Sequence, residues 1–292
     1  MITRFDHAVI GVRDLSSAIR QYQTLGFDVH PGGQHVGLGT HNAIVRFGLD
    51  YLELISVYDE AAAAASGARG DAILNFLRKR EGGLLGYALA ITGIQQEAER
   101  WRSSPITAEP FAMQRRRPDG NLLQWHLLVP SHVAWRRPWP FFIHWDTPDE
   151  QRLSWEGPGE HANGVIRWDG VSVGVRDLEK IANLYRQQVG LQETGPVDEV
   201  PHLKARRACF RLGSACIDLL APQDEGPVQQ MLAEVGEGPF EITLVVKSLE
   251  QTRRYLVQQH IDLEPYPDEP ELFLLPPRLA LGTRLVLKEQ QS

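Results

Sequence analysis

The sequence repeats itself, and this repeat limits the possible folds more than any other feature. The segment RFDHAVIGVRDLSSAIRQYQTLGF starts at Arg4, and the similar segment RWDGVSVGVRDLEKIANLYRQQVGL starts at Arg167. A second pair follows in the same order, RFGLDYLELI from Arg46 and RLGSACIDLL from Arg211. The offset between the copies changes only from 163 to 165 residues. Because self-similarity at a fixed period indicates repeated structural units, the second half of the chain should fold like the first.

Each unit opens with an apolar strand, a short polar turn and an amphipathic helix. In the first unit HAVIGV is rich in β-branched residues, Asp14 is placed to cap a helix, and apolar residues then recur at helical spacing. Short strands are predicted at 27–30, 42–47 and 51–57, which completes a βαβββ unit. Weaker copies of the strand–turn–helix opening begin at Gly86 and Glu241.

The chain therefore predicts an α+β fold of four tandem βαβββ units, paired into two domains with curled mixed sheets. One unit is too small to bury its own sheet face, so paired units should share a core. The segment WDTPDEQRLSWEGPGEHANG is rich in Pro, Gly and acid and has little periodicity. We predict domains at 1–147 and 164–292, with a linker at 148–163. A small helix is expected at 71–80, between units one and two.

Composition limits the class of protein. The 292 residues are 42% hydrophobic and 23% charged, as in an ordinary globular protein, and the formal charge of −7 argues against nucleic-acid or membrane partners. The basic run Arg115–Arg117 precedes a turn and is expected to be a solvated loop. Cys209 and Cys216 are the only cysteines and form no disulfide or zinc-binding pattern. Without a signal peptide or an apolar run that could span a membrane, we expect a cytoplasmic protein.

One acidic residue lies in an unexpected place. Glu53 is flanked by Leu52 and Leu54 in the predicted strand at 51–57. If both faces of that strand are covered, a buried carboxylate needs a cation, a hydrogen-bond donor or a metal as its partner.

These features resemble the vicinal oxygen chelate superfamily, which includes glyoxalases, bleomycin-resistance proteins and extradiol dioxygenases. The stretch GGQHVGLGTHNAIVRFGLDYLELI is similar to the glyoxalase-like subgroup. The resemblance implies two glyoxalase-like domains, of which the first contains the site. It also places metal ligands on the first and last strands of a unit, here at His7 and Glu53. Imidazole plus carboxylate suits Zn²⁺, Fe²⁺, Mn²⁺ or Ni²⁺.

The sequence also departs from that pattern. The positions of unit two that match His7 and Glu53 are Gly86 and roughly Trp125, and neither side chain can ligate a metal. In the second half, Gly170 and Asp218 occupy the two positions, so that half is expected to be degenerate. A divalent metal and no cofactor are thus equally compatible with the sequence, and His7 and Glu53 are also candidates for a catalytic acid–base pair.

Four further residues are candidates for substrate binding. His35 and Asn42 flank the Gly-rich GLGT stretch, whose simpler interpretation is a flexible hairpin loop. Trp125 and His144 belong to aromatic-rich segments that are typical of either a core or a small-molecule pocket.

The leading functional hypothesis is a glyoxalase-like enzyme of lyase, isomerase or dioxygenase type, acting on a small oxygen-bearing metabolite with or without a metal. The alternative is a metal-free protein that binds and sequesters a small molecule, as bleomycin-resistance proteins do, and a third hypothesis is an adaptor with a degenerate site. The expected partner is a small molecule rather than nucleic acid or membrane, and a homodimer is expected by analogy with the fold.

Overall fold

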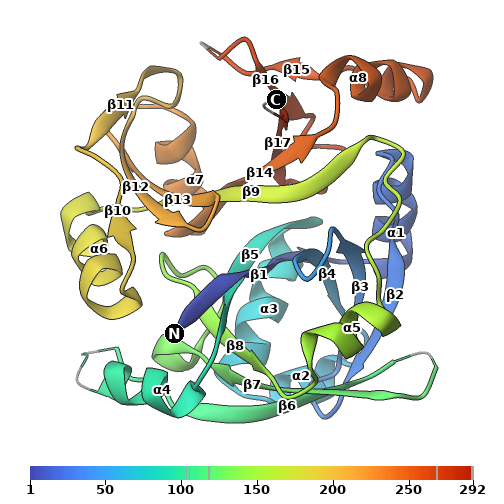
Figure 1. Ribbon diagram of the computed structural model, residues 1–292, viewed down its shortest axis with the longest axis vertical. Coiled ribbons are helices and arrows are strands. Elements are labelled where there is room, and N and C mark those ends of the chain that lie inside the picture. The colour runs from blue at the N-terminus through green and yellow to red at the C-terminus, as the bar shows by residue number, and fades with distance from the viewer. Residues whose placement is uncertain (103, 105, 118, 268, 291–292) are drawn as a thin grey trace.

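The computed structural model describes residues 1–102, 104, 106–117, 119–267 and 269–290. Their fold is α+β, with two sheets of mixed strands and helices packed around them (Figure 1). The first half contains β1 (Ile2–Val12), α1 (Leu15–Thr24), β2 (His30–His35), β3 (Thr40–Arg46), β4 (Tyr51–Val57), α2 (Glu60–Ala65), α3 (Ala68–Lys79), β5 (Gly82–Ile91), α4 (Ile94–Arg102), β6 (Pro110–Arg116), β7 (Leu122–Leu128), β8 (Phe141–Trp145) and α5 (Asp149–Trp155).

The second half repeats this order with shorter edge strands. It contains β9 (Val165–Gly174), α6 (Leu178–Leu184), β10 (Gln192–Glu193), β11 (Asp198–Val200), β12 (Ala205–Leu212), β13 (Ala215–Pro222), α7 (Pro227–Val235), β14 (Gly238–Val246), α8 (Leu249–Gln258), β15 (Glu264–Pro265), β16 (Leu272–Leu275) and β17 (Arg284–Glu289). Within the described parts of the chain, none of the helices combines the length and apolar character needed to cross a bilayer.

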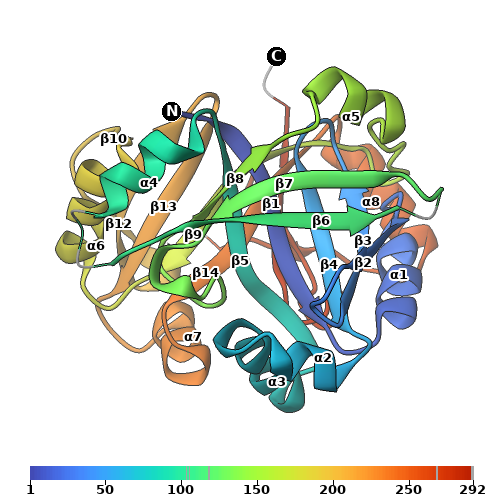
Figure 2. The ribbon, with the colours of Figure 1, turned by 90° about the horizontal axis from the view of Figure 1, so that it is seen from below.

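The sheet of the first half closes into a barrel, in the order β1-β4-β3-β2-β6-β7-β8-β5. Within each unit the first and last strands pair in parallel, β1 with β4 and β5 with β8, and the antiparallel pair β1–β5 joins the two units. Figure 2 shows the long strands β6 and β7 crossing over β1 and β4. The barrel therefore encloses an interior that is lined by both units.

Glycine makes the last closure of the barrel possible. The sequence predicted a strand at 27–30 and a flexible loop after it, but β2 runs from His30 to His35 and pairs with both β3 and β6. A Cβ atom on Gly32 would lie 2.2 Å from the side-chain oxygen of Asn42, and one on Gly33 would lie 2.1 Å from a backbone oxygen of β6. Only glycine permits this approach, because any side chain would force the strands apart.

The two halves share one hydrophobic core rather than two separate ones. A single cluster of buried apolar residues includes members of both sheets. Phe5 packs against Trp168 with ring centroids 4.6 Å apart, and the hydroxyl groups of Tyr87 and Tyr185 are hydrogen-bonded. Figure 1 shows β9 running above β1 and β5. Relative motion of the halves would expose this shared core.

The segment predicted to be a linker is packed against the first barrel. It contains α5, and Glu156 just after this helix forms ion pairs of 2.6 Å with Arg46 and 2.7 Å with Arg115. The expectation that Arg115–Arg117 form a solvated loop is therefore wrong. Arg115 and Arg116 lie on β6, and Arg117 pairs with Glu156 as well, at 2.5 Å. Arg115 has only 4% of its surface exposed, because strand alternation turns it toward the interior.

Candidate functional site

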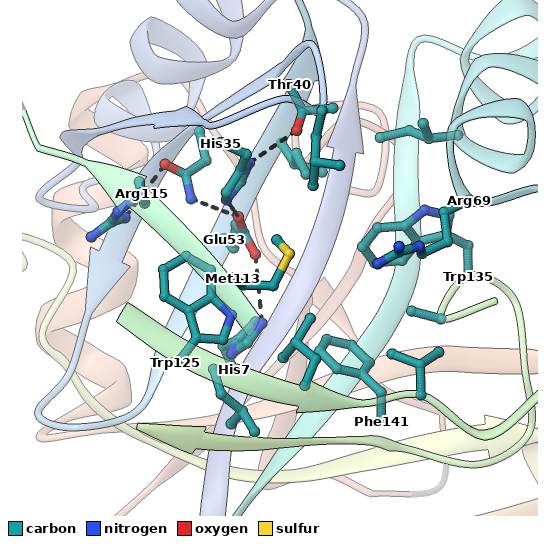
Figure 3. Close-up of a pocket in the computed structure, with 18 of the residues that line it drawn as sticks. His7, His35, Thr40, Glu53, Arg69, Met113, Arg115, Trp125, Trp135 and Phe141 are labelled. Atoms are coloured by element: carbon teal, nitrogen blue, oxygen red, sulfur yellow. Dashed lines mark hydrogen bonds and ion pairs between the residues drawn. The ribbon is translucent and has the colours of Figure 1, made fainter. Parts of the chain in front are cut away.

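The barrel of the first half contains a cavity of about 90 Å³. Because a single water needs roughly 10–15 Å³ on the same scale, the cavity is large enough for a small organic molecule. Most of its wall is apolar or aromatic, with Met113, Trp125, Trp135 and Phe141 among the lining residues. Most of the polar side chains lie on one side, around Glu53, and Arg69 lies on the other (Figure 3). An apolar wall with a few convergent polar groups is typical of a small-molecule site.

Strand alternation brings the polar residues of this site together. His7 on β1 and Glu53 on β4 lie on neighbouring parallel strands, where Val9 is the register partner of Glu53. Thr40 and Asn42 come from β3, and His35 comes from the end of β2. All five residues line the cavity and all are buried. The first unit alone therefore supplies the whole polar cluster.

The hydrogen-bond partner of Glu53 is the side-chain amide of Asn42. Asn42 Nδ2 donates a hydrogen bond of 2.6 Å to Glu53 Oε1. The Nε2 atom of His7 lies 3.5 Å from Glu53 Oε2, and that of His35 lies 3.6 Å from Oε1. These two distances exceed those of a good hydrogen bond. The carboxylate thus has one strong hydrogen bond and one oxygen that remains available to a ligand.

His7 is oriented from behind by a buried carboxylate. Asp6 Oδ1 lies 2.8 Å from His7 Nδ1, and Asp6 itself is fully buried. Although burial alone would raise the pKa of Asp6, its hydrogen bond and charge interaction with His7, together with Arg152 and Arg4, hold that pKa well below the usual range. Ionised Asp6 accepts the Nδ1 proton of His7, so the other nitrogen, Nε2, is directed into the cavity toward Glu53.

His35 is held neutral by its surroundings. Burial is the main cause that lowers its pKa to about 4; Glu53 opposes the shift, and Arg115 and His7 add to it. The Nδ1 atom of His35 lies 2.9 Å from Thr40 Oγ1. When the Thr40 hydroxyl donates to Nδ1, Nε2 of His35 carries the proton and can donate a hydrogen bond to a ligand oxygen.

The residues present do not fit the metal centre of the superfamily. Phe141 pairs with Ala88 on β5 as Glu53 pairs with Val9 on β1, so Phe141, and not Trp125 as expected, occupies the position in unit two that matches Glu53. Gly86 and Phe141 supply no donor atom. Among the described residues, no group of three or more His, Cys, Asp or Glu side chains is arranged to hold a metal ion.

The site residues predicted from the sequence do not all lie in the wall of the cavity. His7, Glu53, His35, Asn42 and Trp125 all line the cavity. The prediction that His144 lines it is wrong. On β8 the residues Phe141, Ile143 and Trp145 line the cavity, whereas His144 is not among the lining residues and its Nδ1 lies 3.1 Å from the Ile91 carbonyl oxygen.

Sequence reasoning missed three charged residues near the site. Asp6 orients His7, Arg69 lines the cavity from α3, and Arg115 lies 3.4 Å from Asn42. Alternation along AMQRR would have turned Arg115 to the same face as Met113. No comparable signal marked Arg69, which lies in a segment outside the repeated units.

Comparison with solved structures places the fold in a known class. A hypothetical protein from Staphylococcus aureus matches with a TM-score of 0.69 and 14% identity, over 99% of this chain and all of the other. A mutant of 4-hydroxymandelate synthase from Streptomyces coelicolor matches with a TM-score of 0.67 and 13% identity, over 100% of this chain and 93% of the other. At these identities the likeness shows that the fold is shared over both halves of the chain, and no more.

Comparison of the sequence with models of known families identifies the family. The model of the family described as "Glyoxalase-like domain" matches residues 5–189, and the chain belongs to this family. No protein of the curated set matches the sequence. The match covers the first barrel from Phe5 onward and the opening of the second half, and it includes every residue of the polar cluster.

Proposed function

We propose that the cavity of the first barrel is the active site of an isomerase- or lyase-type enzyme. It transfers a proton on a small metabolite that has a carbonyl oxygen and an apolar body. The observation that supports this most strongly is the arrangement of Asp6, His7 and Glu53 in a line, with His7 in the middle. In it a buried, ionised carboxylate fixes one nitrogen of an imidazole and directs the other into the cavity.

In the proposed reaction, side chains of the protein move the proton and stabilise the charges that form. His7 Nε2 removes a proton from the carbon next to the substrate carbonyl, and the electron pair of the broken C–H bond moves to the carbonyl oxygen as an enolate. The imidazolium then lies between the carboxylates of Asp6 and Glu53, which stabilise its charge. Neutral His35 donates a hydrogen bond from Nε2 to the enolate oxygen. Return of the proton to another carbon, or loss of a leaving group, completes an isomerisation or an elimination.

A second function is favoured by the apolar wall of the cavity. A protein that sequesters an aromatic molecule needs such a wall and needs no base. In that case the Asp6–His7–Glu53 line would only fix the orientation of the ligand. The difference between the two functions is bond breaking, which can be measured directly.

The test is hydrogen exchange in deuterated water. Aryl ketones and aryl aldehydes of different chain length are incubated with the protein, and deuterium incorporation next to the carbonyl is followed by NMR. We expect at least one compound to exchange about 100-fold faster than in buffer, a rate that His7→Ala abolishes. The control is His144→Ala, which removes a histidine outside the cavity. Binding without exchange throughout the panel would favour sequestration instead.

A further inference from the structure

The cavity has a second polar end, which the proton-transfer proposal does not use. Arg69 lies in the first turn of α3, on the segment that joins the two units of the barrel. Its side chain lines the cavity and its guanidinium lies 4.1 Å from the ring centroid of Phe111. Figure 3 shows Arg69 and Trp135 on the opposite side of the cavity from His35 and Glu53.

Arg69 has no anionic partner in the described part of the chain. Within those residues its guanidinium stacks on Phe111 and forms no ion pair or side-chain hydrogen bond. Glu53 is the only acidic residue among the described residues that line the cavity, and its carboxylate is engaged by Asn42. Burial lowers the pKa of Arg69, which reflects the cost of holding a cation without a counter-ion.

The other cation of the cavity wall is in a different situation. Arg115 Nη2 lies 2.7 Å from Glu156 Oε1, so it already has an anionic partner within the chain, one that it shares with Arg46 and Arg117. A ligand anion would have to displace Glu156 to reach it. Arg69 can accept an anion without such a displacement.

The helix that carries Arg69 adds to the positive potential. The residue at the cap position of α3 is Gly67, and no side chain caps this end of the helix. Ser66, Arg69 and Gly70 from this end all line the cavity. Uncapped N–H groups at the start of a helix favour a nearby negative charge.

We propose that Arg69 binds a carboxylate group of the substrate. The substrate class is then an aromatic or hydrophobic carboxylic acid whose apolar body lies along Phe111, Trp135 and Phe141. This assignment relies on the proposed function only in placing the reactive carbonyl at His7 and Glu53. The anion site itself depends on the charge and surroundings of Arg69.

A carboxylate fits this end better than a phosphate or an amine. One planar guanidinium matches the two oxygens of a carboxylate and balances its single charge. A phosphate monoester carries nearly two charges and would be left with an uncompensated one in an apolar cavity. An amine would meet the positive end of α3 and the guanidinium itself.

The experiment measures binding rather than turnover, by titration calorimetry on the full chain. The probes are hydrocinnamate, hydrocinnamamide, phenylpropylamine and phenethyl phosphate, which share an apolar body and differ in the terminal group. We expect the wild type to bind hydrocinnamate about 10- to 100-fold tighter than the amide, the usual gain from a charge-assisted hydrogen bond. Arg69→Met should reduce this ratio to about one, and Arg69→Lys should keep part of it.

Two controls separate the anion site from other effects. Arg78→Met changes a more exposed arginine of the same helix, which faces Glu60 at 3.4 Å, and should leave the ratio unchanged. His144→Ala, which removes a histidine outside the cavity wall, should also leave it unchanged. Because the readout is binding, the anion site can be established even when no compound of the exchange panel reacts. Conversely, a failure of the anion site would not alter the exchange result.

Four results would overturn the proposal. They are an unchanged preference for hydrocinnamate in folded Arg69→Met, a tightest ligand that is the amine, a phosphate that binds tighter than the carboxylate, and no binding of any probe. In the first case the preference would have to come from Arg115 with Glu156 displaced.

Discussion

The two halves of the molecule place different chemistry at matching positions. Glu53 on β4 has Val9 on β1 as its register partner, and Asp218 on β13 has Ser172 on β9, so the two acids correspond. The first acid is only 6% exposed and lies in an apolar cavity next to His7. The second lies in a polar depression, where Gly170 takes the place of His7.

The closure of the sheet accounts for this difference. In the first half β2 and β6 pair, with His35 opposite Arg115, and the barrel is complete. In the second half the described strands end at the two-residue strands β10 and β15, which do not pair with each other. An open sheet leaves its concave face more accessible to water than a closed cavity does, and the side chain of Asp218 is 24% exposed against 8% for Glu53. The comparison teaches that the repeat conserves the scaffold, whereas strand closure decides where a site can form.

The largest expected effect comes from changing the two corresponding acids. Glu53→Gln should lower the exchange rate of a reactive ketone by about 100-fold or more, because the imidazolium of His7 loses one of its two carboxylate partners. Asp218→Asn should leave the rate within about 2-fold of wild type. The measurement is the NMR exchange assay, performed on both variants under identical conditions.

Equal losses in the two variants would break the comparison. That result would mean that the second half takes part in the chemistry. Circular dichroism of each variant is the control for folding.

The next effect concerns stability and another matched pair of acids. Asp6 is fully buried and hydrogen-bonded to His7, Arg4 and Trp145. Asp6→Asn should lower the free energy of unfolding by about 3–5 kcal/mol, since it removes the fully buried charge that His7, Arg4 and Trp145 contact. Asp169, its counterpart, pairs with Arg167 and Lys288, whose side chains are more than a third exposed. Asp169→Asn should cost at most about 1 kcal/mol. Urea unfolding measures the free energy of unfolding of both variants. Similar losses would contradict the view that the more exposed partners make Asp169 less important than Asp6.

The sequence predicted the scaffold better than the site, for local reasons. The repeat and the alternation of strands predicted the units, and the resemblance to the superfamily placed His7 and Glu53 in one site. Strict alternation of side chains along a strand would place Asp6 and His7 on opposite faces of β1. The structure has a register shift between Phe5 and His7, and this bulge lets the neighbouring side chains meet. His144 was predicted from its aromatic surroundings. On β8 it alternates with Phe141, Ile143 and Trp145, which line the cavity, and it therefore lies on the other face of the strand.

A smaller effect appears in the pH dependence of stability. Burial, followed by the nearby Cys209, raises the pKa of Asp218 to about 8. In the unfolded chain this carboxyl ionises near about pH 4, so the folded state loses stability as the pH rises from about 4 to about 8. Asp218→Asn removes this loss and should stabilise the protein by about 1–3 kcal/mol at pH values above about 8, a range discounted because a quarter of the side chain is exposed. At about pH 4 the variant and the wild type should be equal.

Urea unfolding of both proteins across this pH range is the measurement. A gain that does not grow with pH would show that the mutation acts by packing rather than by charge.

The smallest expected effect is that of added metal. His7 and Glu53 are two ligands, Oε1 of Glu53 already accepts the hydrogen bond from Asn42, and Gly86 and Phe141 add none. When a metal is present at a concentration equal to its dissociation constant, it stabilises a protein by about 0.4 kcal/mol, or about 1 °C in a chain of this size. We expect shifts no larger than this with Zn²⁺, Ni²⁺, Mn²⁺ or Fe²⁺. Metal that stays bound at near-stoichiometric level through dialysis, and is lost in His7→Ala, would instead require His35 to turn and complete the site. The polar cluster would then be a metal centre built from one unit alone, and His7 could not act as the base.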